Sequence, residues 1–447
     1  MIALLRTFAT GQDAPRIDDP QRIDALYRRN RIRVMFAITA GYGLIYMCRL
    51  ALGVVKKPLI DQGIFTPAEL GLIGSALFYT YAVGKLTNGF LADHSNIRRF
   101  LAASFVLTAA CNIGMGFSTV LWLSVLLWGL NGWFQSFGAP GGVVAITSWF
   151  SNRERGRAYG LWSTAHSIGE GLTFLLVGGL VALLGWRWGF WGPGVIGLLT
   201  AIGVYILLQD RPQTLGLPPV ADWKNDHYES DSAQKSTSTL RLQFSILKIP
   251  SIWILALASG TTYVTRYGIN SWGILYLQEE RGYSLPVAGT LLTVNTLAGI
   301  AGAIAYGFIS DKMFDARRPP ANLLFAVLEL IGLGIIFFGP TNTFVLIVGM
   351  LFFGMGLTGL VTSLGGLFAV DIAPKRAAGA AMGVIGVFSY IGAAIQEQVS
   401  GLLINDNMVI VGGDRVYDFG PAIWFWIASS VISMLLAASL WRAKLRD

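Results

Sequence analysis

The chain has 447 residues, of which 54% are hydrophobic and only 13% are charged, and its mean hydropathy is +0.58. A soluble protein of this size needs more charged surface, so the composition disfavours a soluble enzyme and favours an integral membrane protein. The 54 Gly residues agree with this, because membrane helices use glycine for close packing.

Apolar stretches long enough to cross a bilayer, about 20 residues each, recur along the whole chain. They predict an all-α integral membrane protein with twelve transmembrane helices. We expect these helices at 34–56, 68–92, 99–117, 119–142, 157–184, 188–208, 250–277, 286–310, 321–339, 342–369, 378–404 and 420–441. The first 30 residues contain several arginines but no continuous apolar core, so no cleaved signal peptide is expected.

Basic residues lie mainly in the even-numbered gaps between these spans. Because Lys and Arg stay on the cytoplasmic side of a membrane, we expect both termini to be cytoplasmic. The net charge of +8 then reflects topology and not nucleic-acid binding. The odd-numbered gaps contain fewer bases, among them Lys56 and Lys57 at a helix end. The bases in the even-numbered gaps are Arg98, Arg99, Arg153, Arg155, Arg157, Lys312, Arg317, Arg318, Lys375 and Arg376.

One long hydrophilic stretch, 209–247, separates six spans from six. Its Ser, Thr and Asp content predicts a flexible linker without a core of its own. The predicted organisation is a cytoplasmic segment (1–32), a six-helix half (33–208), a cytoplasmic linker (209–247) and a second six-helix half (248–447). Cys48 and Cys111 both lie in predicted spans, so neither a disulfide framework nor a thiol–metal site is expected.

The two halves repeat a costly feature. Tyr46 and Arg49 lie in the first span, and Tyr263 and Arg266 lie 217 residues later in the seventh. An arginine in the hydrocarbon core costs about 2.5 kcal/mol or more, so it persists mainly where it faces a water-filled cavity or an anion. The repetition predicts a central site for a negatively charged ligand, between two parallel repeats.

A loop motif repeats at nearly the same offset. It is the sequence G-x-x-x-D followed by a pair of arginines, after the second span and again after the eighth. We expect these loops to tie helix ends together on one face of the membrane and to act as gates, through Gly89, Asp93, Arg98, Gly307, Asp311 and Arg317.

These loops resemble those of the major facilitator superfamily, and an ordered set of motifs is similar to the organophosphate:phosphate antiporters. That family includes glycerol-3-phosphate, hexose-phosphate and phosphoglycerate transporters and a related sugar-phosphate sensor. The resemblance covers about residues 23–440 and implies two six-helix halves around a central cavity. The motifs include Tyr46-x-x-Arg49, Tyr81-Ala-Val-Gly-Lys85, Asn131-Gly-Trp-Phe-Gln135, Trp162-Ser-Thr-Ala-His166, Tyr263-x-x-Arg266-Tyr267 and Ser310-Asp311-Lys312.

The first span offers Tyr42, Tyr46 and Arg49 on one helical face, because they are spaced i, i+4 and i+7. A guanidinium can donate two parallel hydrogen bonds to a phosphate, and phenols can add further donors. Tyr42 is equally consistent with simple packing. In the seventh span, Tyr263 and Asn270 flank Arg266 in a similar way, and the resemblance implies that both arginines hold the phosphate jointly.

Two further spans add candidates. Tyr81 and Lys85 share a face of the second span, and the resemblance implies that Lys85 contacts substrate. Trp162, His166 and Glu170 share a face of the fifth span, where His166 matches a histidine that the family links to ligand and protonation.

The chain also departs from the family's pattern. Glu170 replaces a usual Gly, and Glu397 is present in the eleventh span, so these two carboxylates and His166 are candidates for proton coupling. Either carboxylate is equally consistent with a structural partner of a Lys or Arg. Bases common in the family are absent at Leu50 and Val144, and acids common in the family are absent at Ser271 and Thr296. Together with the added Glu170 and Glu397, these departures lower the cationic charge of the cavity.

The resemblance implies a monomeric transporter in a bacterial inner membrane that works by alternating access without a cofactor. It would exchange an organophosphate, a small anionic substrate, for inorganic phosphate; no G-x-x-x-x-G-K-[ST] loop for nucleotide binding is present. Two alternatives stay open. One is a sugar-phosphate sensor that signals to a histidine kinase, and the other is a proton-coupled importer of a different organic anion. An enzymatic role is not expected.

Overall fold

The computed structural model of the chain describes residues 8–226, 246–315, 317–373, 377–412 and 414–442. The remaining residues include the predicted loop bases Lys375 and Arg376 and positions 227–245 of the predicted linker, which therefore lie outside the described residues.

Helices make up nearly all of the described chain. The first half contains α2 (Pro20–Asp61), α3 (Pro67–Asp93), α4 (Ile97–Phe117), α5 (Leu121–Gln135), α6 (Gly138–Trp149), α7 (Asn152–Leu172), the π-helical turn η1 (Thr173–Val177), α8 (Gly178–Leu184) and α9 (Trp188–Leu207). Two short helices follow, η2 (Pro212–Leu215) and α10 (Val220–Lys224). The second half contains η3 (Ile246–Lys248), α12 (Pro250–Glu279), α13 (Leu285–Met313), α14 (Arg318–Phe338), α15 (Thr343–Thr362), η4 (Ser363–Leu367), α16 (Phe368–Ile372), α17 (Ala378–Asp406), the strands β1 (Met408–Val411) and β2 (Asp414–Tyr417), α18 (Gly420–Ser439) and η6 (Leu440–Arg442).

Local signals fix several helix starts. At α3 the amide of Glu69 donates to the Thr66 hydroxyl, and the amide of Thr66 donates to the Glu69 carboxylate, so two otherwise unpaired donors are satisfied. Ser151 and Glu154 form the same reciprocal cap at α7.

Within the described residues, nine helices are long and apolar enough to cross a membrane. The other three predicted positions are occupied by α3, by α12 and by α5 together with α6. The predicted span at 119–142 is therefore longer than expected and is interrupted at Ser136 and Phe137. The ring of Pro140 lacks an N–H and clashes with the carbonyl of residue 136, which explains the break.

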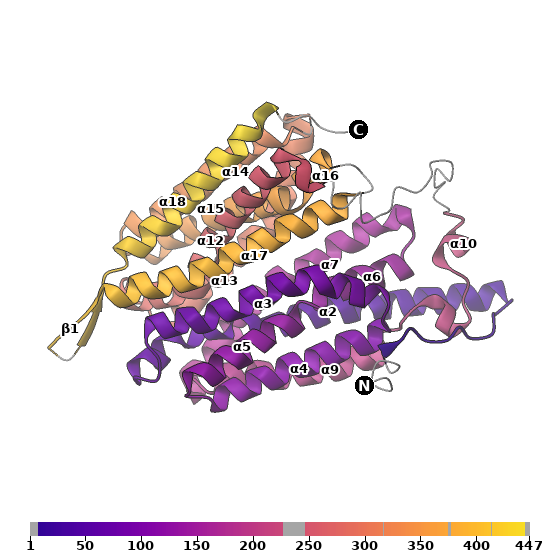
Figure 1. Cartoon of the computed structure of the whole chain (residues 1–447), viewed down its shortest axis with the longest axis horizontal. Coiled ribbons are helices and arrows are strands. Elements are labelled where there is room, and N and C mark those ends of the chain that lie inside the picture. The colour runs from indigo at the N-terminus through magenta and orange to yellow at the C-terminus, as the bar shows by residue number, and fades with distance from the viewer. Residues whose placement is uncertain (1–7, 227–245, 316, 374–376, 413, 443–447) are drawn as a thin grey trace.

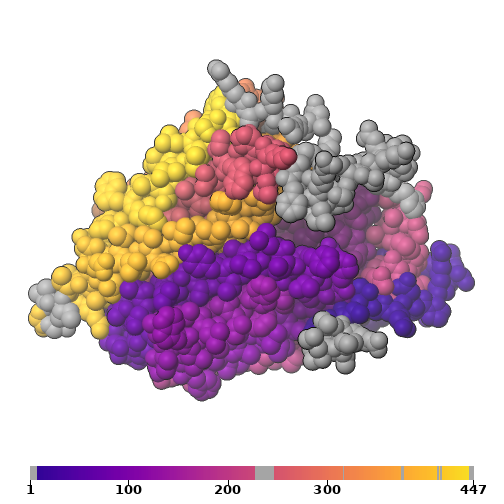
Figure 2. Space-filling model, viewed as in Figure 1, coloured from indigo at the N-terminus to yellow at the C-terminus, as the bar shows by residue number. Residues whose placement is uncertain are grey.

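The helices form two groups that meet face to face (Figure 1). α3 packs along α17, α2 along α12, and α7 with α8 along α13, and these pairs form the interface between the halves. On the face in Figure 2, residues of each half form their own continuous surface.

We name the two ends of the bundle by what they carry. The hairpin end carries β1–β2, the end of α2 and the start of α3, whereas the linker end carries α10, the start of α2 and the end of α3 (Figure 1). The two groups of helices are closest at the hairpin end and diverge toward the linker end (Figure 1).

A short hairpin forms the one β-sheet among the described residues of this otherwise helical fold, and it was not predicted from the sequence. β1 and β2 pair antiparallel, with Met408 opposite Tyr417, between α17 and α18. The sequence MVIVGGDRVY has β-branched residues on both sides of a Gly-Gly pair, a strand–turn–strand pattern that lies just beyond the apolar span.

The start of the predicted linker also differs from the expectation of a segment without a core. Leu217 and Val220 are buried against the first half, and the ring of Trp223 stacks on Tyr27 with centroids 4.0 Å apart. The segment 8–17 adds backbone hydrogen bonds to residues 213 and 216. Residues 209–226 are thus packed onto the linker end of the first half.

Candidate functional site

Arg49 lies in the middle of α2 and is only 3% exposed. Its Nε donates to the Gln135 amide oxygen at 3.0 Å, and its Nη1 donates to the hydroxyls of Tyr390 at 3.2 Å and Tyr46 at 3.5 Å. The guanidinium also lies 4.2 Å from the ring centroid of Tyr81. All these partners are neutral, so the positive charge of Arg49 has no counter-ion among the described residues.

Arg266 lies in α12 and is 7% exposed, but its surroundings are different. Its Nη2 lies 3.0 Å from Oε2 of Glu170, which comes from α7 of the opposite half. The Asn270 amide donates to the other oxygen of Glu170 and accepts a hydrogen bond from Asn295 at 3.4 Å. Arg266 is therefore paired with a carboxylate of the other half, which is one of the two roles that the sequence left open for Glu170.

Aromatic rings fill the space between the two arginines. The hydroxyls of Tyr46 and Tyr267 are 3.4 Å apart, and Arg266 lies 5.6 Å from the rings of Tyr263 and Tyr267. Tyr390 packs against Tyr81 at 4.2 Å and Tyr263 at 5.5 Å between centroids. The predicted pairs Tyr46–Arg49 and Tyr263–Arg266 thus converge in one buried cluster.

Two cavities reach this cluster from the linker end. The Lys85 cavity, about 340 Å³, is lined by residues that include Tyr81, Lys85, Ser136 and Trp162. The His166 cavity, about 570 Å³, is lined by residues that include Ser163, His166, Ser167, Tyr263, Thr358 and Thr362. Tyr159, Gly365 and Met382 line both, so the two cavities are neighbours with shared walls.

The predicted residues Lys85 and His166 face these cavities. Nζ of Lys85 lies 5.2 Å from the ring centroid of Tyr390, and no ion pair forms between Lys85 and another described residue. Nδ1 of His166 is bonded to the Ser163 carbonyl, and Nε2 lies 3.3 Å from the Ser167 hydroxyl.

Tyr42 and Trp162 lie together beside the cluster. Their rings are 5.2 Å apart, and Tyr42 also contacts Tyr46 at 6.0 Å. Trp162 lines the Lys85 cavity, and its buried indole N–H has no acceptor among the described residues. Tyr42 contacts the rings of Tyr46 and Trp162, which is compatible with packing, and both Tyr42 and Trp162 remain candidate contacts.

Glu397 forms a second buried pair across the halves. Its Oε2 accepts from Nζ of Lys56 at 2.9 Å and from the Trp272 indole at 3.0 Å, and Nζ also donates to Ser271 at 2.9 Å. Lys56 is completely buried, and its predicted place at a helix end is wrong, because α2 continues to Asp61. Glu397 is a structural partner of a lysine in this structure.

Both carboxylates lie beside positions where the family's acid is absent. Glu397 reaches the same ammonium that Ser271 contacts, and Glu170 lines one small cavity together with Thr296. Glu397 of α17 and Glu170 of α7 thus place negative charges close to Ser271 and Thr296, the positions of α12 and α13 that lack the acid.

The hairpin end is closed by further contacts between the halves. Lys57 is bonded to Glu279, and the Arg415 guanidinium donates to the Ile60 carbonyl. Burial and the nearby carboxylates of Glu279 and Asp61 raise the pKa of Tyr417 to about 12.

Closure there also depends on glycine. A Cβ at Gly71 of α3 would lie 2.5 Å from the Glu397 carbonyl oxygen, and one at Gly401 of α17 would lie 2.6 Å from the Pro67 carbonyl oxygen. The backbones of α3 and α17 can approach this closely only because both positions lack a side chain.

The two predicted gating loops differ in their contacts. In the second half Arg318, and not the predicted Arg317, bonds Asp311 at 2.9 Å and Asp371 at 2.7 Å. Gly307 precedes this network in α13, and a Cβ at Gly307 would have no atom within 4 Å.

In the first half Asp93 is exposed, and Arg98 donates to the Tyr205 carbonyl instead of pairing with Asp93. A Cβ at Gly89 would likewise meet no atom within 4 Å, so no close contact with another described residue requires glycine at Gly89 or Gly307.

Sequence reasoning missed Tyr390, Tyr267 and Lys56. Tyr390 lies seven residues before Glu397 and therefore shares its helix face, a spacing that could have flagged it. Tyr267 directly follows Arg266 in the motif Tyr263-x-x-Arg266-Tyr267, and this adjacency could have marked it as a site residue.

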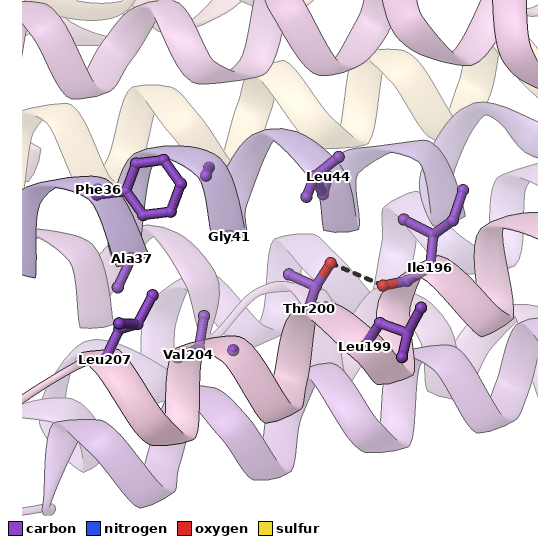
Figure 3. Close-up of a pocket in the computed structure, with 11 residues that line it drawn as sticks. Phe36, Ala37, Gly41, Leu44, Ile196, Leu199, Thr200, Val204 and Leu207 are labelled. Atoms are coloured by element: carbon purple, nitrogen blue, oxygen red, sulfur yellow. Dashed lines mark hydrogen bonds between the residues drawn. The ribbon is translucent and has the colours of Figure 1, made fainter. Parts of the chain in front are cut away.

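One more groove lies between α2 and α9 and is lined by α2 residues other than Tyr42, Tyr46 and Arg49 (Figure 3). Phe36, Leu44, Leu199 and Leu207 line it, and the Thr200 hydroxyl is already bonded to the Ile196 carbonyl at 2.7 Å. The groove contains no charged side chain, so it is not a candidate for anion binding.

Comparison with known proteins agrees with this architecture. Residues 38–396 match the profile described as Major Facilitator Superfamily. The chain belongs to the major facilitator superfamily. It is a multi-pass membrane protein of a family of transporters, not of enzymes.

Curated relatives narrow the family further. The membrane sensor protein UhpC of Salmonella typhimurium is 36% identical over 390 residues, covering 86% of this chain and 87% of that protein. A probable hexose phosphate transport protein of Chlamydia trachomatis is 31% identical, covering 96% and 94%. The glycerol-3-phosphate transporter of Bacillus subtilis is also 31% identical, covering 99% of both chains. These relatives confirm the predicted organophosphate:phosphate antiporter family.

Solved structures share the fold at low sequence identity. A bacterial homolog of the human lysosomal transporter Spinster, in an inward-facing and unoccupied conformation, matches with a TM-score of 0.73 at 17% identity. The match covers 92% of this chain and 96% of that chain. A likeness at this identity confirms the fold class and carries no information on substrate.

Proposed function

We propose that the protein moves phosphorylated organic anions across a bacterial inner membrane by alternating access, in exchange for inorganic phosphate. The observation that carries the proposal is the position of Arg49 and Arg266. Each half buries one arginine behind a tyrosine that lines a cavity at the linker end: Tyr81, 4.2 Å from Arg49, lines the Lys85 cavity, and Tyr263, 5.6 Å from Arg266, lines the His166 cavity. An anion that bridges the two arginines can couple the halves.

The proposal includes an orientation. Arg98, Arg153 and Arg155 lie at the linker end, and Lys and Arg are retained in the cytoplasm, so this end faces the cytoplasm together with both termini. The cavities then open inward, while Lys56–Glu397 and Lys57–Glu279 close the opposite side.

Exchange in proteoliposomes tests the proposal. Vesicles loaded with phosphate should take up labelled phosphate or a labelled sugar phosphate, whereas vesicles without an internal substrate should take up neither. Arg49→Lys and Arg266→Lys should each abolish exchange, because an ammonium does not reproduce a guanidinium fork. Arg187→Lys, at an exposed arginine beside Trp186, is the matched control. A wild-type protein that exchanges no organophosphate contradicts the proposal.

A sensor for the same ligands is the second candidate, supported by the 36% identity to a membrane sensor protein. The same vesicles separate the two functions. A sensor binds phosphate or sugar phosphates without moving them, and a carrier of other organic anions exchanges carboxylates that phosphate does not compete with.

A further inference from the structure

The charges of the central site are divided unequally between the two cavities. On the side of the Lys85 cavity, Arg49 and Lys85 carry two positive charges that no carboxylate among the described residues neutralises. On the other side, Arg266 is already paired with Glu170 at 3.0 Å. The site is therefore cationic at one end and close to neutral at the other.

The neutral end is also lined by hydrogen-bonding groups. A cavity of about 10 Å³, the size of a single hydroxyl oxygen or water, is lined by Arg266 and Glu170 themselves and by the polar residues Ser167, Asn270, Asn295, Thr296 and Thr358. Ser167 and Thr358 also line the His166 cavity, so the small cavity lies directly beside the larger one. Glu170 is only 3% exposed and accepts hydrogen bonds on both of its oxygens.

A phosphate on Arg266 would lie next to this carboxylate. Two negative groups in a site of low dielectric repel each other strongly, and Arg266 offers less net attraction than an unpaired arginine. A hydroxyl group meets no such conflict, because it can donate to the Glu170 carboxylate and accept from the Arg266 guanidinium at the same time. An ammonium group would add a further cation beside Arg49, Lys85 and Arg266.

We propose that the two arginines bind different parts of one ligand: Arg49 with Lys85 binds the phosphoryl group, and Arg266 with Glu170 binds hydroxyl groups. This inference rests on the proposed function and narrows its substrate to phosphate monoesters of polyols or sugars. A phosphate dianion balances the two free charges of Arg49 and Lys85. The organic part then occupies the His166 cavity, among Ser163, Ser167 and Thr362.

Competition against labelled inorganic phosphate tests the division. The matched probes are a hexose 6-phosphate and cyclohexylmethyl phosphate, which has a six-membered ring without hydroxyls. The wild-type protein should prefer the hexose phosphate by about tenfold or more, because buried polar groups reject a ligand that leaves them unpaired. Glu170→Gln should reduce that preference to about threefold or less while inorganic phosphate binds equally well or better, since Arg266 loses its counter-ion.

The control is Glu280→Gln, at an exposed position of the hairpin end, which should leave both affinities unchanged. Retained phosphate binding by Glu170→Gln also reports that the variant is folded. If it instead weakens phosphate and hexose phosphate by the same factor, Glu170 merely positions Arg266 in a shared phosphate site, and the proposal is wrong. A wild-type protein without preference between the probes also overturns it.

A third probe addresses the charge of the ligand. Glucosamine 6-phosphate places an ammonium where the hexose has a hydroxyl, and a preference for it of about tenfold would assign Glu170 to a cationic group and contradict the proposal. A wild-type protein that neither binds nor exchanges inorganic phosphate contradicts the proposed function itself, so the two failures are distinguishable.

Discussion

The ammonium of Lys56 lies 2.9 Å from a carboxylate oxygen of Glu397, and both side chains are buried between the two halves. Lys56 belongs to α2 and Glu397 to α17, so the pair must separate if the hairpin end opens. Trp272 and Ser271 of α12 complete its hydrogen bonds.

A double-mutant cycle on this pair should show strong coupling. Either Glu397→Gln or Lys56→Met leaves one buried charge without its partner, which costs about 3–5 kcal/mol, whereas removing both charges is far milder. Thermal melting of the purified protein measures all three variants. The same cycle on the more exposed Lys57 and Glu279 should show coupling of about 1 kcal/mol or less. Additive effects of the two buried substitutions would contradict this account.

Tyr390→Phe should weaken substrate binding moderately. The ring and its contacts with Arg49 and Lys85 stay, but the hydroxyl that accepts from Arg49 is lost, a change of about 1 kcal/mol, or about fivefold in KM for phosphate exchange. Tyr390→Leu also removes the ring and should cost more. Tyr79→Phe, at an exposed tyrosine of α3, provides the comparison. An unchanged KM in Tyr390→Leu would show that Tyr390 does not organise the site.

Arg318→Lys should loosen the linker end of the second half. Arg318 joins Asp311 of α13 to Asp371 of α16 with two separate nitrogens, an arrangement that a single ammonium does not reproduce. Loss of one charge-assisted hydrogen bond costs about 1.5–3 kcal/mol and should lower the melting temperature. Arg317→Lys next to it should have no effect, since Arg317 is exposed. Equal effects of the two substitutions would restore Arg317 as the functional arginine of this loop.

Gly401→Val should favour an open hairpin end. The new side chain would overlap the Pro67 carbonyl and the Gly71 backbone, because even a Cβ at Gly401 would lie 2.8 Å from the Gly71 Cα. α3 and α17 must therefore move apart. Spin labels at Gln62 and Val409 report the distance between the halves at this end. In Gly401→Val the longer label-to-label distances should be more populated than in the unsubstituted protein. Gly178→Ala, where a Cβ meets no atom within 4 Å, should leave the distances unchanged. Unchanged distances in Gly401→Val would mean that the contact does not control closure.

Spacing along single helices predicted much of the site. Tyr46 and Arg49 are three residues apart, as are Tyr263 and Arg266, and this spacing predicted that each pair shares one helix face. The structure brings both pairs into one cluster. Contacts between helices were not predictable in this way. Arg49 contacts Tyr390, and Lys56 contacts Glu397, each across 341 positions of the sequence. The second contact lies seven residues further along both α2 and α17 than the first, so the two contacts have the same separation in sequence.

The pairing of Glu170 with Arg266 shows the same limit. The sequence placed both residues inside the membrane and left the role of Glu170 open between coupling and structural pairing. Its partner depends on how α7 of one half faces α12 of the other, and no periodicity within either helix contains that information. The hairpin at Met408–Tyr417 was not predicted because each of its strands has only four residues, too few to stand out beside apolar stretches of membrane-spanning length.

The contact between Gly71 and Gly401 also affects how the protein moves. The α3 and α17 backbones attract each other at these glycines through dispersion, and the dispersion energy falls steeply when the separation grows by about an ångström. A gap of about 0.5–1 Å between α3 and α17 therefore already removes about a quarter to a half of this attraction, whereas long flexible side chains would keep contact across such a gap. Intermediate separations at Gly71 and Gly401 are thus poorly stabilised, which favours an all-or-none opening of the hairpin end over a gradual one.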